Sequence, residues 1–253
     1  MRNTRALLRS FCRLLVSDRL FGDEIVAMVL GSDLQLTRNS SEERIAAFRH
    51  LLATWRDAVN ADEPPELFSD AALLDSAGPP PSDMQVALLM ADVLNLPLSE
   101  IEAILAPQST SVTELVISGR LQLAGSAEGD VVVLEDEFLI AEDLRGIIES
   151  LSASVKGMAS NVAKGLDLVR THAPQVILVD YRLRGGPTGL DFVRQVREFH
   201  DCTSIFVTAF PDLLLQGDED EPDAVITKPY TREGVRAAVA HALSTPRIPS
   251  HPE

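Results

Sequence analysis

The second half of the chain alternates short, β-branched apolar runs with amphipathic segments that carry apolar residues at helical spacing. The five runs are VVVL before Glu135, ASVKGMA from Ala153, VILV before Asp180, IFV before Thr208 and AVIT before Lys228. Five strand–helix units in succession are typical of a doubly wound parallel sheet with helices on both faces. We therefore expect a five-stranded α/β domain over residues 130–246, with a short tail over residues 247–253.

Polar side chains follow four of these runs directly. Glu135 and Asp136 follow the first run, Asp180 the third, Thr208 the fourth and Lys228 the fifth. Because the carboxyl ends of parallel strands meet at one edge, where such sheets bind ligands, we expect these side chains in one crevice. Three carboxylates, a hydroxyl and a lysine suit a divalent cation and a phosphoryl group.

Phosphoryl transfer to a carboxylate needs an ionised acceptor, a cation that neutralises the incoming oxygens, and further donors. Asp180 is the best acceptor, since it ends the central strand and precedes a flexible Gly-Gly-Pro turn. Glu135 and Asp136 would hold Mg²⁺ together with Asp180, because this small, hard cation takes a few carboxylates and keeps several waters. Glu137 fits better as an acid at a helix start than as a ligand.

The order of the five units and the placement of the acids resemble the receiver domain of two-component response regulators, over residues 130–245. The resemblance implies that Lys228 pairs with the phosphoryl group and that Thr208 donates its hydroxyl to it. The implied Mg²⁺ ligands are Glu135, Asp136, Asp180 and the backbone carbonyl of Arg182. Many receivers carry an aromatic residue three positions before the lysine, where this chain has Val225. The usual coupling of threonine and aromatic is therefore in doubt, and Tyr230 is a candidate to take part of that role.

Residues 1–125 carry helical rather than strand periodicity and are expected to form an all-α domain. Residues 1–62 resemble the second region of extracytoplasmic-function sigma factors, and residues 83–125 resemble the fourth. The proline-rich and acidic residues 63–82 between them are expected to be a linker. A sigma-like half followed by a receiver is similar to the PhyR family of alphaproteobacterial general-stress-response regulators.

Charge argues against a promoter-binding role for the helical half. The chain has a formal net charge of −16, and its first 125 residues hold ten arginines, no lysine and seventeen acids, a net charge of −7. Base readout needs Arg, Lys, Asn or Gln at the groove and several cations at phosphates. The candidate recognition helix, Ser111 to Leu123, offers only Arg120 and Gln122 and also carries Glu114. We expect no direct DNA binding.

The apolar residues of that helix, Leu115, Val116 and Leu121, fit either a core or a surface for a protein partner. The family resemblance implies the second: the sigma-like half captures a small anti-sigma factor of the NepR kind. The hypothesis is a partner switch in which a sensor histidine kinase phosphorylates Asp180, the sigma-like half opens to the anti-sigma factor, and the sigma factor is released. The chain would then be a regulator and not an enzyme.

Two alternatives belong to other classes. The first is a response regulator that binds DNA and acts directly as a transcription factor. The second is an aspartyl-phosphate phosphatase, which is disfavoured because Arg182 stands two positions after Asp180, where that chemistry places a second acid. Cys12 and Cys202 are expected to be buried thiols in a reducing cytoplasm. No apolar run approaches the ~18–20 residues of a membrane span, and we expect no membrane association.

Overall fold

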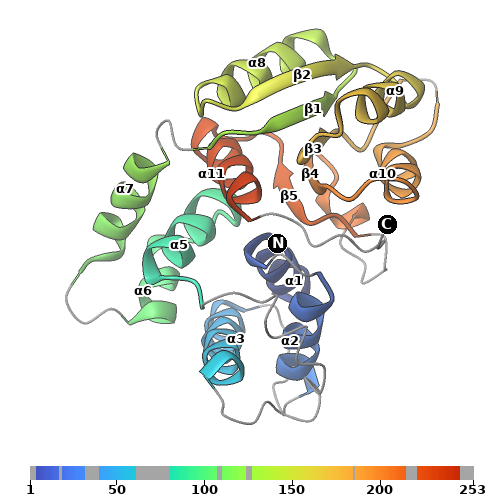
Figure 1. Cartoon of the computed structure of the whole chain (residues 1–253). Helices are drawn as coiled ribbons and strands as arrows, with labels where there is room; N and C mark the ends of the chain where they lie inside the picture. Colours follow the sequence, from blue (N-terminus) through green and yellow to red (C-terminus); the bar gives the residue numbers. More distant parts are fainter. Residues whose placement is uncertain are drawn as a thin grey trace. The chain divides into compact units, whose positions relative to one another are not determined.

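The computed structural model describes residues 4–16, 19–31, 40–60, 80–106, 110–123, 127–184, 186–214 and 221–245. The chain forms two compact units, residues 1–119 and 120–253, here called the helical unit and the sheet unit (Figure 1). The division falls inside helix α7 (Val112–Gln122), a few residues before the boundary expected near residue 125. Most of the expected linker, over residues 63–79, lies outside the described residues.

The sheet unit contains the five-stranded parallel sheet that the alternating pattern predicts. Its strands are β1 (Asp130–Leu134), β2 (Ser154–Ala159), β3 (Val176–Val179), β4 (Thr203–Thr208) and β5 (Ala224–Thr227). They pair in the order β2-β1-β3-β4-β5, and every pairing is parallel. The expected fold class is therefore confirmed, and β1 and β3, which precede the acids, are neighbours.

Helices cover both faces of this sheet (Figure 1). They are α8 (Phe138–Glu149), α9 (Val162–His172), α10 (Gly189–Arg197) and α11 (Arg232–Ser244). Helix α8 packs with α11, and α9 packs with α10. Alternate strand residues such as Val132 and Leu134 join one core cluster with Phe192 of α10. Since strand side chains alternate between faces, Val131 and Val133, which are equally buried, point to the other face.

One expected helix is not formed in the described residues. The segment after β4 was expected to continue as an amphipathic helix, but Pro211–Leu213 forms a single 3₁₀ turn, η3. Leu214 is buried whereas the neighbouring Leu213 is 43% exposed. Residues 215–217 of the expected segment, DLLLQG, lie outside the described residues.

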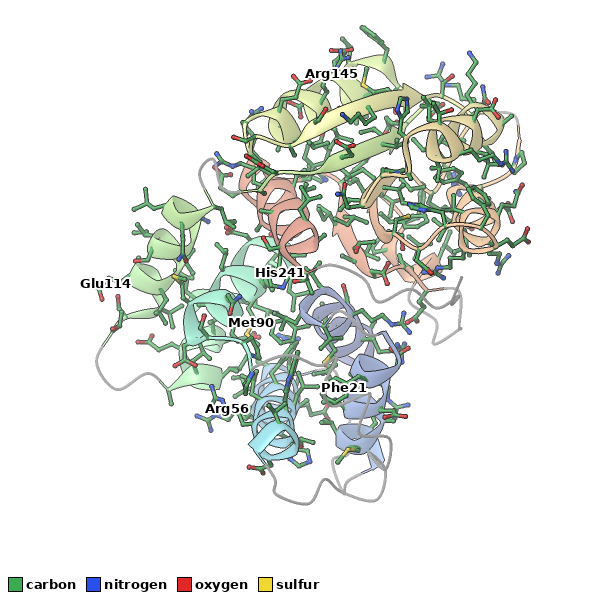
Figure 2. The ribbon with its side chains drawn as sticks, in the orientation of Figure 1. Phe21, Arg56, Met90, Glu114, Arg145 and His241 are labelled. Atoms are coloured by element: carbon green, nitrogen blue, oxygen red, sulfur yellow. The ribbon has the colours of Figure 1, made fainter. Side chains whose placement is uncertain are left out.

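The helical unit is built from short amphipathic helices. They are α1 (Thr4–Leu15), α2 (Arg19–Gly31), α3 (Ser41–Asn60), α5 (Asp83–Leu88), the π-helical turn η2 (Leu89–Val93), α6 (Leu98–Leu105) and α7. Helices α1, α2 and α3 pack on one another around aromatic side chains. Phe11 meets Phe48 edge-on at 5.5 Å between ring centroids, and Phe21 meets Trp55 at 6.3 Å. Figure 2 labels Phe21 among the side chains of this unit.

A buried ion pair ties α3 to α6. The Arg44 guanidinium donates to both carboxylate oxygens of Glu100, through Nε at 2.8 Å and through a terminal nitrogen at 2.6 Å. Ser41 also donates to Glu100. Both charged side chains are at least nine-tenths covered, so each depends on the other for its polar partner.

The cysteines differ slightly from expectation. Neither Cys12 nor Cys202 joins a disulfide, but only Cys12 is buried and Cys202 is half-buried. Among the helices in the described ranges, none is both long and apolar enough to cross a membrane.

Candidate functional site

Three carboxylates converge at the carboxyl edge of the sheet. Glu135 and Asp136 follow β1 directly, and Asp180 follows the adjacent strand β3. The register places them together, because the Asp180 amide donates to the Leu134 carbonyl at 2.8 Å. One oxygen from each carboxylate lies within 4.8 Å of the other two. This is a set of hard oxygen donors of the kind that Mg²⁺ accepts.

Lys228 reaches this cluster from the end of β5. Its Nζ donates to Glu135 Oε2 at 2.7 Å and to Asp180 Oδ2 at 2.9 Å. Burial alone would lower the pKa of Lys228, but the hydrogen bonds from Nζ to Glu135 and Asp180 outweigh it, and the net pKa lies above its usual value. Burial raises the pKa of Glu135 despite the hydrogen bond from Lys228. The lysine therefore stays charged beside two carboxylates, one of which is almost fully covered.

Thr208 ends β4 at the same edge and is fully buried. Its Oγ1 accepts a hydrogen bond from the Phe210 amide at 3.2 Å, and its carbonyl accepts one from the Lys228 amide at 2.8 Å. The backbone bond fixes the ends of β4 and β5 side by side. The threonine hydroxyl thus stands next to the strand end that carries the lysine.

Arg182 lies two residues after the central carboxylate. Its amide approaches Asp180 Oδ1 at 3.4 Å, a long contact, and its guanidinium stacks over the Phe210 ring at 3.9 Å from the centroid. The stacking directs the side chain toward the β4–β5 side of the crevice. The ligand role expected of the Arg182 backbone carbonyl stays a prediction.

A second arginine contacts the site, and no sequence pattern predicted it. Arg184 Nε donates to Asp136 Oδ2 at 2.9 Å. Its side chain is 79% exposed, whereas that of Asp136 is 9% exposed. The residue lies in an irregular loop, where periodicity does not constrain the direction of a side chain.

Val225 stands where many receivers carry an aromatic residue, and Tyr230 is the candidate to take part of the role of that residue. Val225 is buried in the core of the sheet, at 1% exposure. The hydroxyl of Tyr230 donates to Asp143 Oδ2 of α8 at 2.9 Å, and burial, followed by the contact with Asp143, raises the pKa of Tyr230. Tyr230 therefore links the turn after Lys228 to α8. Glu137, which was not expected to be a ligand, is exposed, and its amide donates to Glu135 Oε1 at 3.1 Å.

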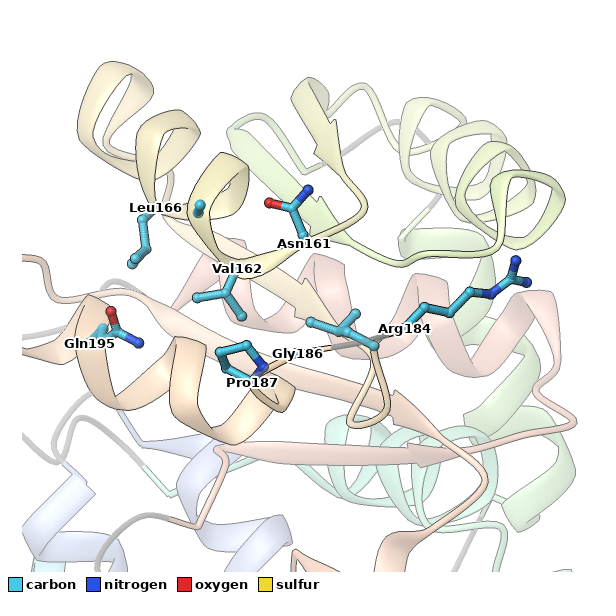
Figure 3. Close-up of a pocket in the computed structure, with 9 residues that line it drawn as sticks. Asn161, Val162, Leu166, Arg184, Gly186, Pro187 and Gln195 are labelled. Atoms are coloured by element: carbon cyan, nitrogen blue, oxygen red, sulfur yellow. The ribbon is translucent and has the colours of Figure 1, made fainter.

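A pocket of roughly 310 Å³ opens beside this edge, between α9 and the loop that joins β3 to α10 (Figure 3). Its lining is mostly apolar, including Val162, Leu166 and Pro187. Arg184 borders the pocket, and in Figure 3 its side chain extends away from the apolar lining residues.

Comparisons with known proteins agree with this geometry. Residues 131–240 match the response regulator receiver domain. The phyllosphere-induced regulator PhyR of Methylorubrum extorquens is 28% identical over 93% of this chain and 90% of its own length. Because this similarity spans both units, it covers the unusual order of a helical half before a receiver.

The chain contains a response regulator receiver domain and is similar to PhyR regulators along almost its whole length. The crystal structure of PhyR from Brucella abortus superposes with a TM-score of 0.74 at 26% identity, covering 95% of this chain and 91% of that one. The anti-anti-sigma factor PhyR from Bartonella quintana gives a TM-score of 0.73 at 25% identity, covering 94% and 92% of the two chains. PhyR proteins are regulators and not enzymes, as the sequence predicts for this chain.

The candidate recognition helix is α7. Ser111 and Glu114 form a capping box at its start: the Ser111 amide donates to Glu114 at 2.9 Å, and the Glu114 amide donates to Ser111 Oγ at 3.2 Å. The Ser111 amide and the Ser111 hydroxyl both donate to the Glu114 carboxylate, and these two bonds lower the pKa of Glu114. Val116 is buried and Leu115 half-buried, whereas Leu121 is 71% exposed. Of the three apolar residues that fitted either a core or a partner surface, Val116 therefore lies in the core, whereas Leu121 lies at the surface.

Proposed function

We propose that this chain is a phosphorylation-controlled regulator of the general stress response, with Asp180 as the phosphoryl acceptor and capture of an anti-sigma factor as the output. The observation that carries the proposal is the convergence of three carboxylates and Lys228 at one edge of a receiver sheet. A sensor histidine kinase would supply the phosphoryl group in the cytoplasm. The chain itself then needs only to receive it and to respond.

The surroundings of Asp180 support its role as acceptor. Its Oδ2 contacts Lys228 and its Oδ1 faces the Arg182 amide, so both oxygens already lie near groups that favour negative charge. Glu135 is less suited, because its side chain is 1% exposed and is held by Lys228 and by the Glu137 amide. A phosphoryl group on Asp180 would lie beside Lys228, with Thr208 at the next strand end.

The donor set fits Mg²⁺. Glu135, Asp136 and Asp180, with the backbone carbonyl of Arg182, would hold the cation. When bound, Mg²⁺ would neutralise charge on the oxygens of the transferring phosphoryl group. The chain's own contribution is to keep three carboxylates together and to position Lys228 as a fixed positive charge.

The proposed output is a protein captured by the helical unit. The relative from Bartonella quintana is described as an anti-anti-sigma factor, which supports a NepR-like anti-sigma factor as the partner here. Phosphorylation of Asp180 would open the helical unit to this partner, and the sigma factor that the partner had held would be released. Exposed apolar side chains of α7, Ile117 and Leu121, suit contact with an amphipathic partner helix.

The test is capture of a NepR-like anti-sigma factor on beads by the full chain, with and without a small-molecule phosphodonor and Mg²⁺. The wild-type chain should capture more partner when the donor is present, and Asp180→Asn should abolish that increase. Asp167→Asn is the matched control, because Asp167 is 80% exposed on α9, outside the crevice. Donor-dependent capture that survives in Asp180→Asn would refute the acceptor assignment.

Direct promoter binding is the rival function. Glu114 is engaged in capping its own helix, and the first 125 residues have a net charge of −7 from ten arginines and seventeen acids, which disfavours contact with phosphates. Sequence-specific binding of the phosphorylated chain to duplex DNA at physiological salt, measured by gel shift, would replace the anti-sigma proposal.

A further inference from the structure

Arg184 reaches the carboxylate cluster from the solvent side. It lies in the loop after β3, and its Nε donates to Asp136 Oδ2 at 2.9 Å. The arginine side chain is 79% exposed and covers a carboxylate that is 9% exposed. The Arg184 side chain therefore extends from solvent onto a nearly covered acid.

This contact completes a pattern of charge pairing. Lys228 bonds to Glu135 and Asp180, and Arg184 bonds to Asp136, so each carboxylate of the cluster has a cationic partner within the chain. The chain thus places two positive groups on the same carboxylates that a divalent cation would use. A cation that enters must either displace these groups or bind beside them against charge repulsion.

We infer that Arg184 competes with the divalent cation for Asp136 and thereby sets the cation affinity of the site. Mg²⁺ takes oxygen ligands at roughly 2.0–2.1 Å in octahedral geometry. The guanidinium of Arg184 occupies part of the acceptor capacity of Asp136 Oδ2 and places a positive charge beside the position that the cation would take. The inference rests on the proposed Mg²⁺ site. In the absence of the metal, the guanidinium of Arg184, on the loop after β3, would supply positive charge to Asp136 in its place.

Arg184 is better suited to this role than Lys228. Lys228 has a side chain 16% exposed and holds two carboxylates, so its removal would leave covered acids unpaired. Arg184 has one carboxylate partner in the cluster and lies in water, where an ion pair is worth about two- to fivefold in an equilibrium constant. Because the Arg184 side chain is 79% exposed, the guanidinium can leave Asp136 for solvent without displacing packed side chains.

Calorimetric titration of the full chain with MgCl2 tests this inference without any phosphorylation assay. Arg184→Gln should lower the Mg²⁺ dissociation constant about two- to fivefold, and Arg184→Lys, which keeps the charge, should stay closer to wild type. Higher ionic strength should narrow the difference between wild type and Arg184→Gln, since salt screens an exposed charge.

Arg170→Gln is the matched control. It removes the same charge from the last turn of α9, at the opposite edge of the sheet, and should leave the dissociation constant unchanged. An Arg184→Gln protein that binds Mg²⁺ as wild type does, or more weakly, overturns the inference, as does an equal gain in Arg170→Gln. If neither wild type nor Arg184→Gln binds Mg²⁺, the proposed cation site fails and this inference fails with it.

Discussion

Replacing Arg44 by methionine tests whether the ion pair between α3 and α6 holds the helical unit together. Glu100 is 7% exposed and accepts hydrogen bonds from Arg44 and Ser41. Methionine approximates the length of the arginine stem but lacks the charge and all five donors. The Glu100 carboxylate would remain covered and would keep the hydrogen bond from Ser41 but lose both bonds from Arg44.

The expected cost is large for a single substitution. Breaking a buried ion pair from one side typically costs about 3–5 kcal/mol, because the other charge stays desolvated. Arg56→Met is the control on the same helix, since Arg56 pairs with Asp83 at 3.0 Å with side chains 50% and 45% exposed. Such an exposed pair is worth about 0–1 kcal/mol. We therefore expect a difference of roughly 3 kcal/mol between the two variants.

Urea unfolding followed by Trp55 fluorescence measures this difference. Trp55 is the single tryptophan of the chain and is buried in the helical unit, so its signal reports that unit and not the sheet unit. The double variant Arg44→Met with Glu100→Leu should recover most of the stability, because replacing both members of a buried pair by apolar residues is often neutral.

The loss of unfolding free energy in Arg44→Met should also depend on pH. The hydrogen bond from Arg44 lowers the pKa of Glu100 in the native wild type. That contribution is complete above the unfolded pKa of about 4.5 and is lost as pH falls through the native pKa. In Arg44→Met, burial without the arginine would raise the pKa of Glu100 in the native state, so the variant gains stability as pH falls. The difference in the free energy of unfolding between wild type and Arg44→Met should therefore narrow from neutral pH toward about pH 4.5. If Arg44→Met loses no more unfolding free energy than Arg56→Met at every pH, the ion pair between Arg44 and Glu100 does not stabilise the helical unit as described.

Three further substitutions probe the sheet unit. Lys228→Met leaves Glu135 covered and unpaired; it should lower the melting temperature in calorimetry and abolish donor-dependent capture of the partner. Gly189→Ala places a β-carbon 2.1 Å from the Asp180 carbonyl oxygen, so it should cost about 1–3 kcal/mol by denaturant unfolding monitored by circular dichroism, and a neutral effect would contradict the packing. Val225→Phe adds a ring at a position 1% exposed and should cost a similar amount, about 1–3 kcal/mol, rather than restore the aromatic found in other receivers.

Much of the sheet unit follows from local sequence. Period, strand length and the placement of helices predict a parallel sheet, and parallel pairing alone brings residues 135, 180 and 228 to one edge. The structure brings Glu135, Asp136, Asp180 and Lys228 into contact range, as expected from their positions after strands. Their roles in cation and phosphoryl binding remain predictions for the experiments above.

Other features do not follow from local sequence. The single 3₁₀ turn η3 over Pro211–Leu213 and the burial of Leu214 beside the exposed Leu213 are not evident from local periodicity, because burial depends on the rest of the sheet unit. The π-helical turn Leu89–Val93 interrupts a segment whose periodicity predicts one continuous helix. Arg44 and Glu100 are 56 residues apart, and each resembles an ordinary surface charge until α3 and α6 pack together.

The class of fold and the group of side chains at the carboxyl edge follow from the sequence, because alternating strands and helices predict parallel pairing, which brings the carboxyl ends of the strands to one edge. The pairing of each acid with a basic side chain is visible only in the folded chain: Lys228 bonds to Glu135 and Asp180, and Arg184 bonds to Asp136. The direction of a long side chain on an irregular loop depends on the charges that surround it. Those charges follow strands that are distant in the chain, so local sequence does not specify which of them a given side chain meets.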